Sequence, residues 1–232
     1  MTEFDEEIRA ARFDELRSGF TASVSHELRT PLARILALLE NAELPGADVH
    51  GLIDQARAEV ENAGALIDEI LFLSELESGR EVVALGHTNA LPILREVLDE
   101  HEDAAARAGV RLEAGGDTAV DLPLRPRMLR IVAENLVENA IRYAGHGSTF
   151  RLEAGRAGVT TLTAADDGVG VSEADLGRLF ERFYRADAAR ASRGTGLGLA
   201  IVKHVVAAAG GTVEARSARG QGLEVRCLFP TA

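Results

Sequence analysis

Apolar residues recur at steps of three or four through the first 80 positions, which is the spacing of one face of an α-helix. The pattern stops at Pro45-Gly46, a dipeptide that breaks helices, and then resumes. It therefore predicts an antiparallel hairpin of two helices. The apolar positions of the first helix are Phe13, Leu16, Phe20, Val24, Leu28, Leu32, Ile35 and Leu39, and those of the second are Ile53, Ala56, Val60, Ala63, Ile67, Ile70 and Leu71.

Two helices cannot enclose a hydrophobic core on their own, because each buries only one face. We expect the hairpin to pair with that of a second chain in a four-helix bundle, which makes the protein a homodimer. The alternative is that the hairpin packs on the remainder of its own chain.

Beyond Ser78-Gly79-Arg80 the pattern changes to short strands that alternate with helices. Mixed strands and helices over about 150 residues make one α/β two-layer sandwich. The sequence thus predicts an α+β fold of two domains, the helical hairpin over residues 1–80 and the sandwich over residues 81–232. The expected strands are 82–87, 110–114, 149–154, 159–165, 212–217 and 223–229, and the expected helices are 90–107, 126–143 and 198–209.

Charge is divided unevenly between these two domains. The 232 residues carry a formal net charge of −12. Residues 1–80 hold 17 acidic and seven basic side chains, net −10, whereas residues 81–232 hold 20 and 18, net −2. An acidic hairpin is a poor match for DNA, RNA or an anionic membrane surface, which attract basic faces, so we expect no nucleic-acid partner.

Membrane and disulfide signals are absent from the sequence. No apolar run reaches the roughly 18 residues that cross a bilayer, and no signal-peptide pattern opens the chain, so we expect a soluble, cytoplasmic chain without membrane contact. A single cysteine, Cys227, excludes an internal disulfide and a cysteine-based zinc site. Its place in a strand-like stretch predicts a buried structural thiol.

The first candidate site is the string FTASVSHELRTPL, residues 20–32. His26 and Thr30 are four residues apart and share a helix face, with Glu27 beside them. Pro31 removes a backbone donor and should loosen the helix just past the histidine. A neutral imidazole is a competent nucleophile, and a neighbouring carboxylate can stabilise the cation that develops. A single exposed histidine is usually only a solvated residue, so the whole string carries this interpretation.

The second candidate site is a pair of asparagines in the predicted helix 126–143. Asn135 and Asn139 are four residues apart and share one helix face. Amide oxygens at this spacing can hold Mg²⁺ without outcompeting phosphate for it. Such a pair is unremarkable in isolation, and its interpretation depends on the strings around it.

Two glycine-rich runs complete the set of candidate sites. Asp166 follows the apolar strand 159–165, where a carboxylate can accept from a ligand's amino group, and the glycines after it let the backbone approach that ligand. The second run leads at once into a helix, which presents backbone N–H groups to phosphates. It is neither a Walker A sequence nor a Rossmann fingerprint. The runs contain Gly168 and Gly170, and Gly194, Gly196, Gly198 and Leu199.

These strings, with FERFYR at residues 180–185, resemble in order the sequence boxes of bacterial sensor histidine kinases. The resemblance covers residues 13 to 230. It implies a Bergerat-type ATP-binding domain joined to a histidine phosphotransfer hairpin, with ATP and Mg²⁺ as cofactors. His26 would take the γ-phosphoryl group on Nε2 and pass it to an aspartate of a response regulator. Glu27 would orient the ring through Nδ1, and Thr30 would position water when the hairpin dephosphorylates the regulator.

The same resemblance assigns roles in the ATP-binding domain. Asn135 and Asn139 belong to the N box, in which Asn139 would be the Mg²⁺ ligand. Arg142, where the family more often has lysine, would contact phosphate, and Tyr143 would lie on the adenine side. Asp166 would read adenine, with Gly168 and Gly170 beside it.

The remaining boxes lie around the expected ATP lid, residues 187–193. Phe180 belongs to the F box, whose aromatic side chains help to seat this lid. Gly194, Gly196 and Gly198 match the second glycine box. Gly220-Gln-Gly222-Leu223 resembles a further glycine box in which Leu223 replaces the usual polar residue.

Two other classes of function were weighed against an autokinase. DNA gyrase and mismatch-repair ATPases resemble the same ATP-binding domain, but they place a glutamate four residues before the magnesium asparagine, where this chain has Asn135. A non-catalytic scaffold or a phosphatase-dominated module is the third class, although every box is filled. Residues 1–12 would be the end of a signalling helix, and a longer parent protein would be anchored in the inner membrane.

Overall fold

The computed structural model describes residues 3–78, 86–186 and 194–230. The chain divides into two compact units, Met1–Phe72 and Leu73–Ala232. The α+β fold class is confirmed, while the predicted domain boundary at residue 80 stays a prediction. None of the helices in the described ranges combines the length and the apolar character needed to span a membrane.

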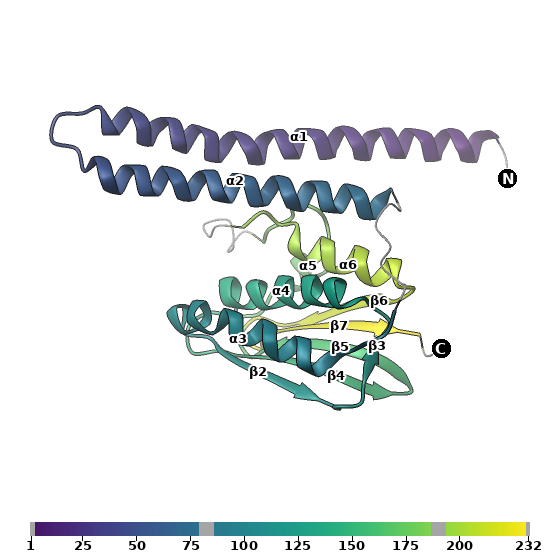
Figure 1. Ribbon diagram of the computed structural model, residues 1–232. Coiled ribbons are helices and arrows are strands. Elements are labelled where there is room, and N and C mark those ends of the chain that lie inside the picture. Colours follow the sequence, from purple (N-terminus) through teal and green to yellow (C-terminus); the bar gives the residue numbers. More distant parts are fainter. Residues whose placement is uncertain (1–2, 79–85, 187–193, 231–232) are drawn as a thin grey trace. The chain divides into compact units, whose positions relative to one another are not determined.

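The first unit is a helical hairpin, as predicted (Figure 1). Helix α1 spans Glu3–Ala42 and helix α2 spans Val49–Glu77, and the turn between them contains Gly46 at φ +82°. Within the described side chains part of the apolar stripe is uncovered, although Ala56 is buried. Leu32, Leu39, Ile53, Val60, Ile67 and Leu71 of the stripe, and Leu36 beside it, are each 44–61 % exposed.

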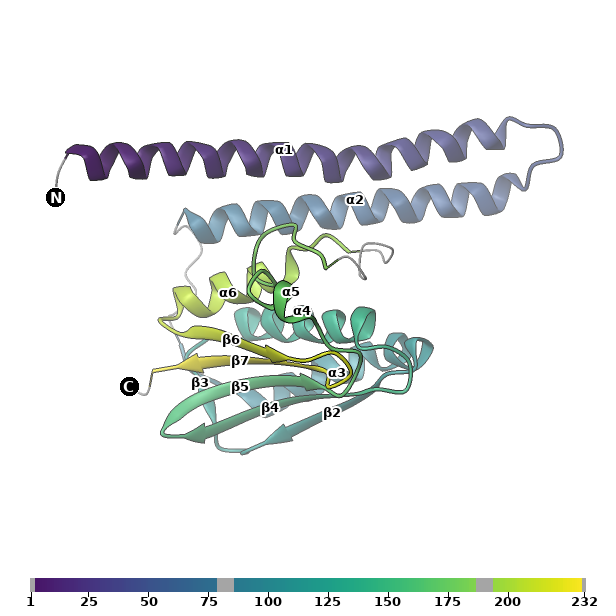
Figure 2. The same ribbon diagram turned by 180° about the vertical axis from the view of Figure 1, so that it is seen from behind.

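The second unit is a five-stranded sheet with helices on one face (Figures 1 and 2). The strand order is β2-β4-β5-β7-β6, in which β2 and β4 are parallel and all other neighbours are antiparallel. The strands are β2 Arg111–Gly116, β4 Thr149–Ala157, β5 Val159–Asp166, β6 Thr212–Ser217 and β7 Leu223–Phe229. The covering helices are α3 Ala90–Ala108, α4 Pro126–Tyr143 and α6 Gly198–Ala208.

The core lies between this sheet and its helices. Along β7 the buried residues alternate with half-buried ones, because successive side chains point to opposite faces of a strand. Helix α4 starts with Pro126, which needs no donor there, and buries Leu136, Val137 and Ala140. Cys227 is fully buried, and burial raises the pKa of its thiol to about 12, so the predicted structural thiol is confirmed.

One predicted strand, residues 82–87, falls mostly on residues 82–85, which lie outside the described part of the chain. Its last two residues, 86–87, are not in a strand and precede a two-residue strand, β1 (Thr88–Asn89). This strand pairs with β3 (Asp121–Leu122), which the sequence pattern missed together with the short helix α5 (Glu173–Leu176). The pairing partner decides where β1 begins, and a two-residue partner leaves no periodic signal.

Candidate functional site

His26 lies on α1 with its side chain 78 % exposed to solvent. Its Nδ1 is 3.9 Å from Oε1 of Glu27, within reach of an ion pair but longer than a hydrogen bond. Because the carboxylate faces the Nδ1 edge of the ring, the Nε2 edge is available to a reaction partner. The two residues that the sequence paired are therefore neighbours in the structure.

Thr30 and Pro31 modify the helix one turn after the histidine. The Oγ1 of Thr30 donates to the backbone carbonyl of His26 at 3.4 Å. Helix α1 continues through Pro31, whose missing N–H leaves the carbonyl four residues earlier without its helical donor. This loosening is local, because α1 remains one helix from Glu3 to Ala42.

A groove on α1 presents His26 together with two cations. Arg34 contacts Oε1 of the buried Glu59, at 3.6 Å, and is thereby tied to α2. Guanidinium groups on the same surface as the exposed imidazole can attract a phosphate group. The groove is lined by His26, Arg29, Thr30, Ala33, Arg34 and Ala37.

The polar face of α4 carries the N-box residues. Asn135 is committed to its own helix, since its Nδ2 donates to the carbonyl of Ile131 at 2.8 Å. Asn139 is half-buried one turn further along the same face. Arg142 donates to Oε2 of Glu138 at 2.9 Å, an exposed i,i+4 pair of the kind that contributes little to stability.

The second glycine run lies directly against this face of α4. A Cβ placed on Gly194 would lie 2.6 Å from the Tyr143 hydroxyl oxygen, and one on Gly198 would lie 2.7 Å from Oδ1 of Asn135. The run thus follows the asparagine face for about two helical turns. Gly198 is the first residue of α6, so the backbone N–H groups at the N-terminus of that helix lie beside this face of α4. Leu199 is buried in the core, and its role in binding stays a prediction.

Asp166 is held at the end of β5 by backbone donors. Its Oδ1 accepts from the N–H of Gly168 at 2.9 Å and from that of Leu223 at 3.3 Å. Burial raises the pKa of this carboxyl, and the two backbone hydrogen bonds oppose that rise. The carboxylate is fixed in direction at a partly desolvated position, which suits the reading of a ligand's amino group.

The glycines after Asp166 allow close backbone contact. Gly170 has φ +65°, and a Cβ there would lie 2.1 Å from the carbonyl oxygen of Ala218. The Ser217 hydroxyl donates to the carbonyl of Gly222 and accepts from the N–H of Val171, so it connects the loop after Asp166 with the glycine box at residues 220–223. Ser217 was missed as part of the site, and only its closeness to the glycine box at residues 220–223 could have indicated it, whereas Leu223 was named in that box without its hydrogen bond to Asp166.

The F box meets the second glycine run through the backbone. The N–H of Phe183 donates to the carbonyl of Gly196 at 3.0 Å. Phe180 is half-buried in the turn that precedes this contact. The expected lid, residues 187–193, lies outside the described residues.

The donor set of this region fits Mg²⁺ better than a transition metal. In the part of the chain that the structure describes, no three His, Cys, Asp or Glu side chains are grouped so that they could hold a metal ion. Mg²⁺ is usually bound through only one or two protein oxygens together with substrate phosphates and water. The amide oxygen of Asn139 can supply such a ligand.

Two family models match the chain. Residues 16–79 match the His Kinase A (phospho-acceptor) domain, and residues 124–232 match the histidine kinase-, DNA gyrase B- and HSP90-like ATPase family. The sensor-like histidine kinase SenX3 of Mycobacterium tuberculosis is 34 % identical over 95 % of this chain and 55 % of its own length. The phosphate regulon sensor protein PhoR of Pseudomonas aeruginosa is 33 % identical, over 97 % of this chain and 52 % of its own length. The chain spans about half the length of these curated relatives.

Solved structures share the fold. The Acinetobacter baumannii histidine kinase AdeS superposes with a TM-score of 0.74 at 23 % identity, covering 89 % of this chain and 98 % of AdeS. The histidine kinase ThkA, solved in complex with the response regulator TrrA, superposes with a TM-score of 0.75 at 19 % identity. The match covers 100 % of this chain and 68 % of the ThkA chain. Full-length ShkA in complex with AMPPNP superposes with a TM-score of 0.66 at 28 % identity, covering 91 % of this chain and 45 % of the ShkA chain.

Proposed function

Because this chain belongs to the sensor histidine kinases of two-component signalling, we propose that it phosphorylates His26 from ATP and passes the phosphoryl group to a response regulator. Two features of the chain carry the proposal. The exposed His26 imidazole has the Glu27 carboxylate at its Nδ1 edge, and the glycine run at residues 194–198 lies against the face of α4 that carries Asn135. The first group supplies a nucleophile and the second supplies a nucleotide site.

His26 acts as the nucleophile in this proposal. The Nε2 lone pair attacks the γ-phosphorus of ATP, the bond to the β,γ-bridging oxygen breaks, and ADP leaves. Glu27 favours the tautomer with its proton on Nδ1 and stabilises the positive charge that the ring acquires. A closer approach than the 3.9 Å separation gives the full hydrogen bond during reaction.

Asp166 and the face of α4 position the nucleotide. The Asp166 carboxylate accepts from the adenine 6-amino group, and Arg142 exchanges its weak surface pair with Glu138 for a phosphate. Asn139 would hold Mg²⁺, which when bound neutralises charge on the phosphates. The glycine run and the N-terminus of α6 offer backbone donors to the same phosphates. ShkA, a relative in fold, was solved with AMPPNP, a non-hydrolysable ATP analogue.

Transfer to histidine is favoured over ATP hydrolysis by the chemistry of Asn135. An amide cannot take a proton from water, and the Nδ2 of this one is already committed to the Ile131 carbonyl. Hydrolysis by a gyrase-like mechanism would need a general base at this position.

The partners follow from the hairpin. Its uncovered stripe of leucine, isoleucine and valine is suited to pairing with a second copy in a four-helix bundle. The regulator's receiver domain would dock beside His26. ThkA, a relative in fold, was solved in complex with the response regulator TrrA. In the reverse, phosphatase reaction, Thr30 would orient the water that hydrolyses the acyl phosphate of the regulator. We place this part of the protein in the cytoplasm, where ATP is available, and propose that a longer parent is membrane-anchored.

Transfer of a radioactive phosphoryl group tests the proposal. The wild-type chain, incubated with γ-labelled ATP and Mg²⁺, should become labelled, and an added receiver domain should withdraw the label as a base-labile acyl phosphate. His26→Gln should show neither step, whereas His50→Gln, which changes an exposed histidine elsewhere on the hairpin, should behave as wild type. Label that persists in His26→Gln contradicts the assignment of the nucleophile.

A further inference from the structure

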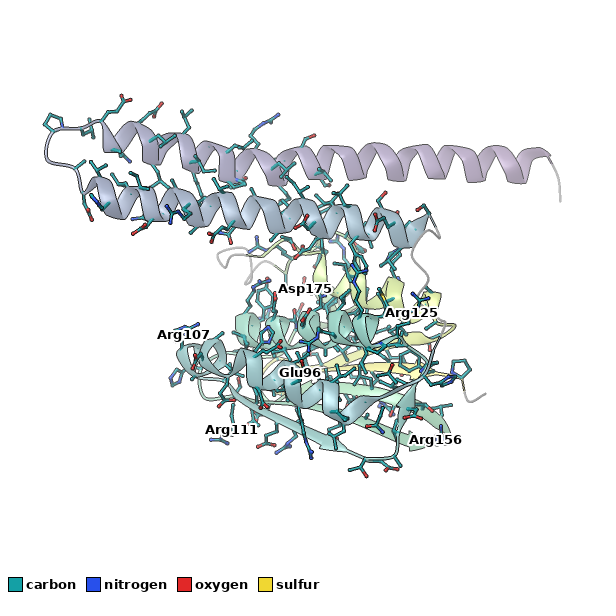
Figure 3. The ribbon with its side chains drawn as sticks, viewed as in Figure 1. Glu96, Arg107, Arg111, Arg125, Arg156 and Asp175 are labelled. Carbon is teal, nitrogen blue, oxygen red and sulfur yellow. The ribbon has the colours of Figure 1, made fainter. Side chains whose placement is uncertain are left out.

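Asp175, labelled in Figure 3, lies on the short helix α5. Both of its carboxylate oxygens accept hydrogen bonds from hydroxyl groups. Oδ2 accepts from the Ser172 hydroxyl at 2.5 Å, and Oδ1 accepts from the Tyr184 hydroxyl at 2.5 Å. The first bond is local, since Ser172 is also the N-cap of α5. The second joins α5 to the F box nine residues later.

Tyr184 is also held from the side of its ring. The guanidinium carbon of Arg178 lies 4.1 Å from the ring centroid, the geometry of a cation–π contact. Arg178 is in turn fixed by Glu181, to which its Nε donates at 3.1 Å. With its hydroxyl and its ring face both in contact, the side chain of Tyr184 has one preferred position.

The residue before Tyr184 adopts a strained backbone. Phe183 has φ +59°, and it is the one non-glycine residue with positive φ in the described ranges. This conformation is unfavourable for a bulky residue and persists only where its surroundings hold it. Phe183 donates to the carbonyl of Gly196, which itself has φ +71°, and a Cβ on Gly196 would lie 2.8 Å from the Phe183 carbonyl carbon.

We propose that Asp175 is a positioning residue for nucleotide binding, acting through the Tyr184 hydroxyl to hold the Phe183 turn against Gly196. The Phe183 turn thereby keeps the glycine run at residues 194–198 beside Tyr143 and Asn135, where the phosphates would bind. This inference rests on the proposed function, because the nucleotide is assigned to that run. A purely structural role predicts a less stable domain whose folded molecules bind nucleotide normally.

The test measures binding of a non-hydrolysable ATP analogue with Mg²⁺ by calorimetry, below the onset of unfolding of each variant. Asp175→Ala and Tyr184→Phe should each weaken binding about tenfold, the usual effect of losing a hydrogen bond to a charged group. The double variant should be no weaker than the poorer single one, because both changes break the same bond. Asp175→Asn should bind within about twofold of wild type, since its amide oxygen still accepts from Tyr184. Glu173→Ala, on the exposed side of the same helix, is the matched control.

Wild-type affinity in folded Asp175→Ala and Tyr184→Phe, or additive effects in the double variant, would overturn the inference. Tyr184→Phe removes a single oxygen and carries the test if Asp175→Ala does not fold. The proposed function fails separately, if the wild-type chain itself neither binds the analogue nor labels His26.

Discussion

The backbone N–H of Leu223 donates to Oδ1 of Asp166 across 57 positions of sequence. This hydrogen bond connects the end of β5 with the start of β7, and it fixes the carboxylate by a main-chain donor rather than by a side chain. A position that usually carries a polar residue in this family can therefore be occupied by a buried leucine. Backbone donors thus orient the carboxylate that we propose reads adenine.

Asp166→Asn should separate nucleotide binding from stability. Asparagine can accept the same two backbone hydrogen bonds, but its amide nitrogen would face the adenine amino group, donor against donor, so we expect affinity to fall by about tenfold or more. Burial raises the pKa of Asp166 in the folded state, and the stability linked to that shift is lost as the pH rises through the folded-state value. At neutral pH the neutral variant should thus unfold at an equal or higher urea concentration.

The same shift predicts a pH dependence of binding. Wild-type affinity for the nucleotide analogue should decrease as the pH falls through the raised pKa of Asp166, since protonation removes the acceptor. Asp166→Asn should lack this decrease. Calorimetry across the acidic range checks both, and a variant that binds as tightly as wild type contradicts the assignment of Asp166.

Gly170→Ala should disturb the loop that follows Asp166. An alanine at φ +65° costs roughly 1–2 kcal/mol, and its Cβ would meet the Ala218 carbonyl, so the unfolding free energy should fall by more than about 1 kcal/mol. The matched control is Gly177→Ala, at φ −64° with no atom within 4 Å of the new Cβ, which should stabilise by about 0.4–1 kcal/mol. Urea unfolding of the two variants should therefore show shifts of opposite sign.

Much of this architecture could be predicted from local patterns in the sequence. Helix α4 begins at Pro126 and ends at Tyr143, as expected, because apolar period and an N-terminal proline are local signals. Strand β1 could not be placed, since its bounds depend on pairing with the distant Asp121–Leu122. The site, too, was only partly predictable. Local motifs indicated Asp166, but its hydrogen bond with Leu223 becomes visible only in the folded sheet.

Asn139→Ala should abolish phosphoprotein formation without dissociating the dimer. The variant lacks the amide oxygen proposed for Mg²⁺, while the hairpin that we propose pairs the chains is unchanged. Labelling with γ-labelled ATP and light scattering on the same sample measure the two properties. Normal labelling of a correctly sized dimer would refute the metal-ligand role.

The uncovered stripe of the hairpin predicts a dimer, so light scattering should report about twice 24.7 kDa. Leu36→Glu places a charge beside that stripe and should shift the mass toward that of a single chain. Leu44→Glu is the matched control, because this leucine is equally exposed, 59 % against 58 %, but lies in the turn between the helices. A wild-type monomer at high concentration would contradict the bundle.

The most direct measurement is tandem mass spectrometry of the phosphorylated chain after digestion with trypsin at alkaline pH. The peptide 18–29, between Arg17 and Arg29, contains one histidine together with several hydroxyl groups. We predict a single phosphoryl group on the imidazole of His26, lost in acid and stable in base. A phosphoryl group on a hydroxyl of this peptide, or on any other residue while His26 stays unmodified, would contradict the account.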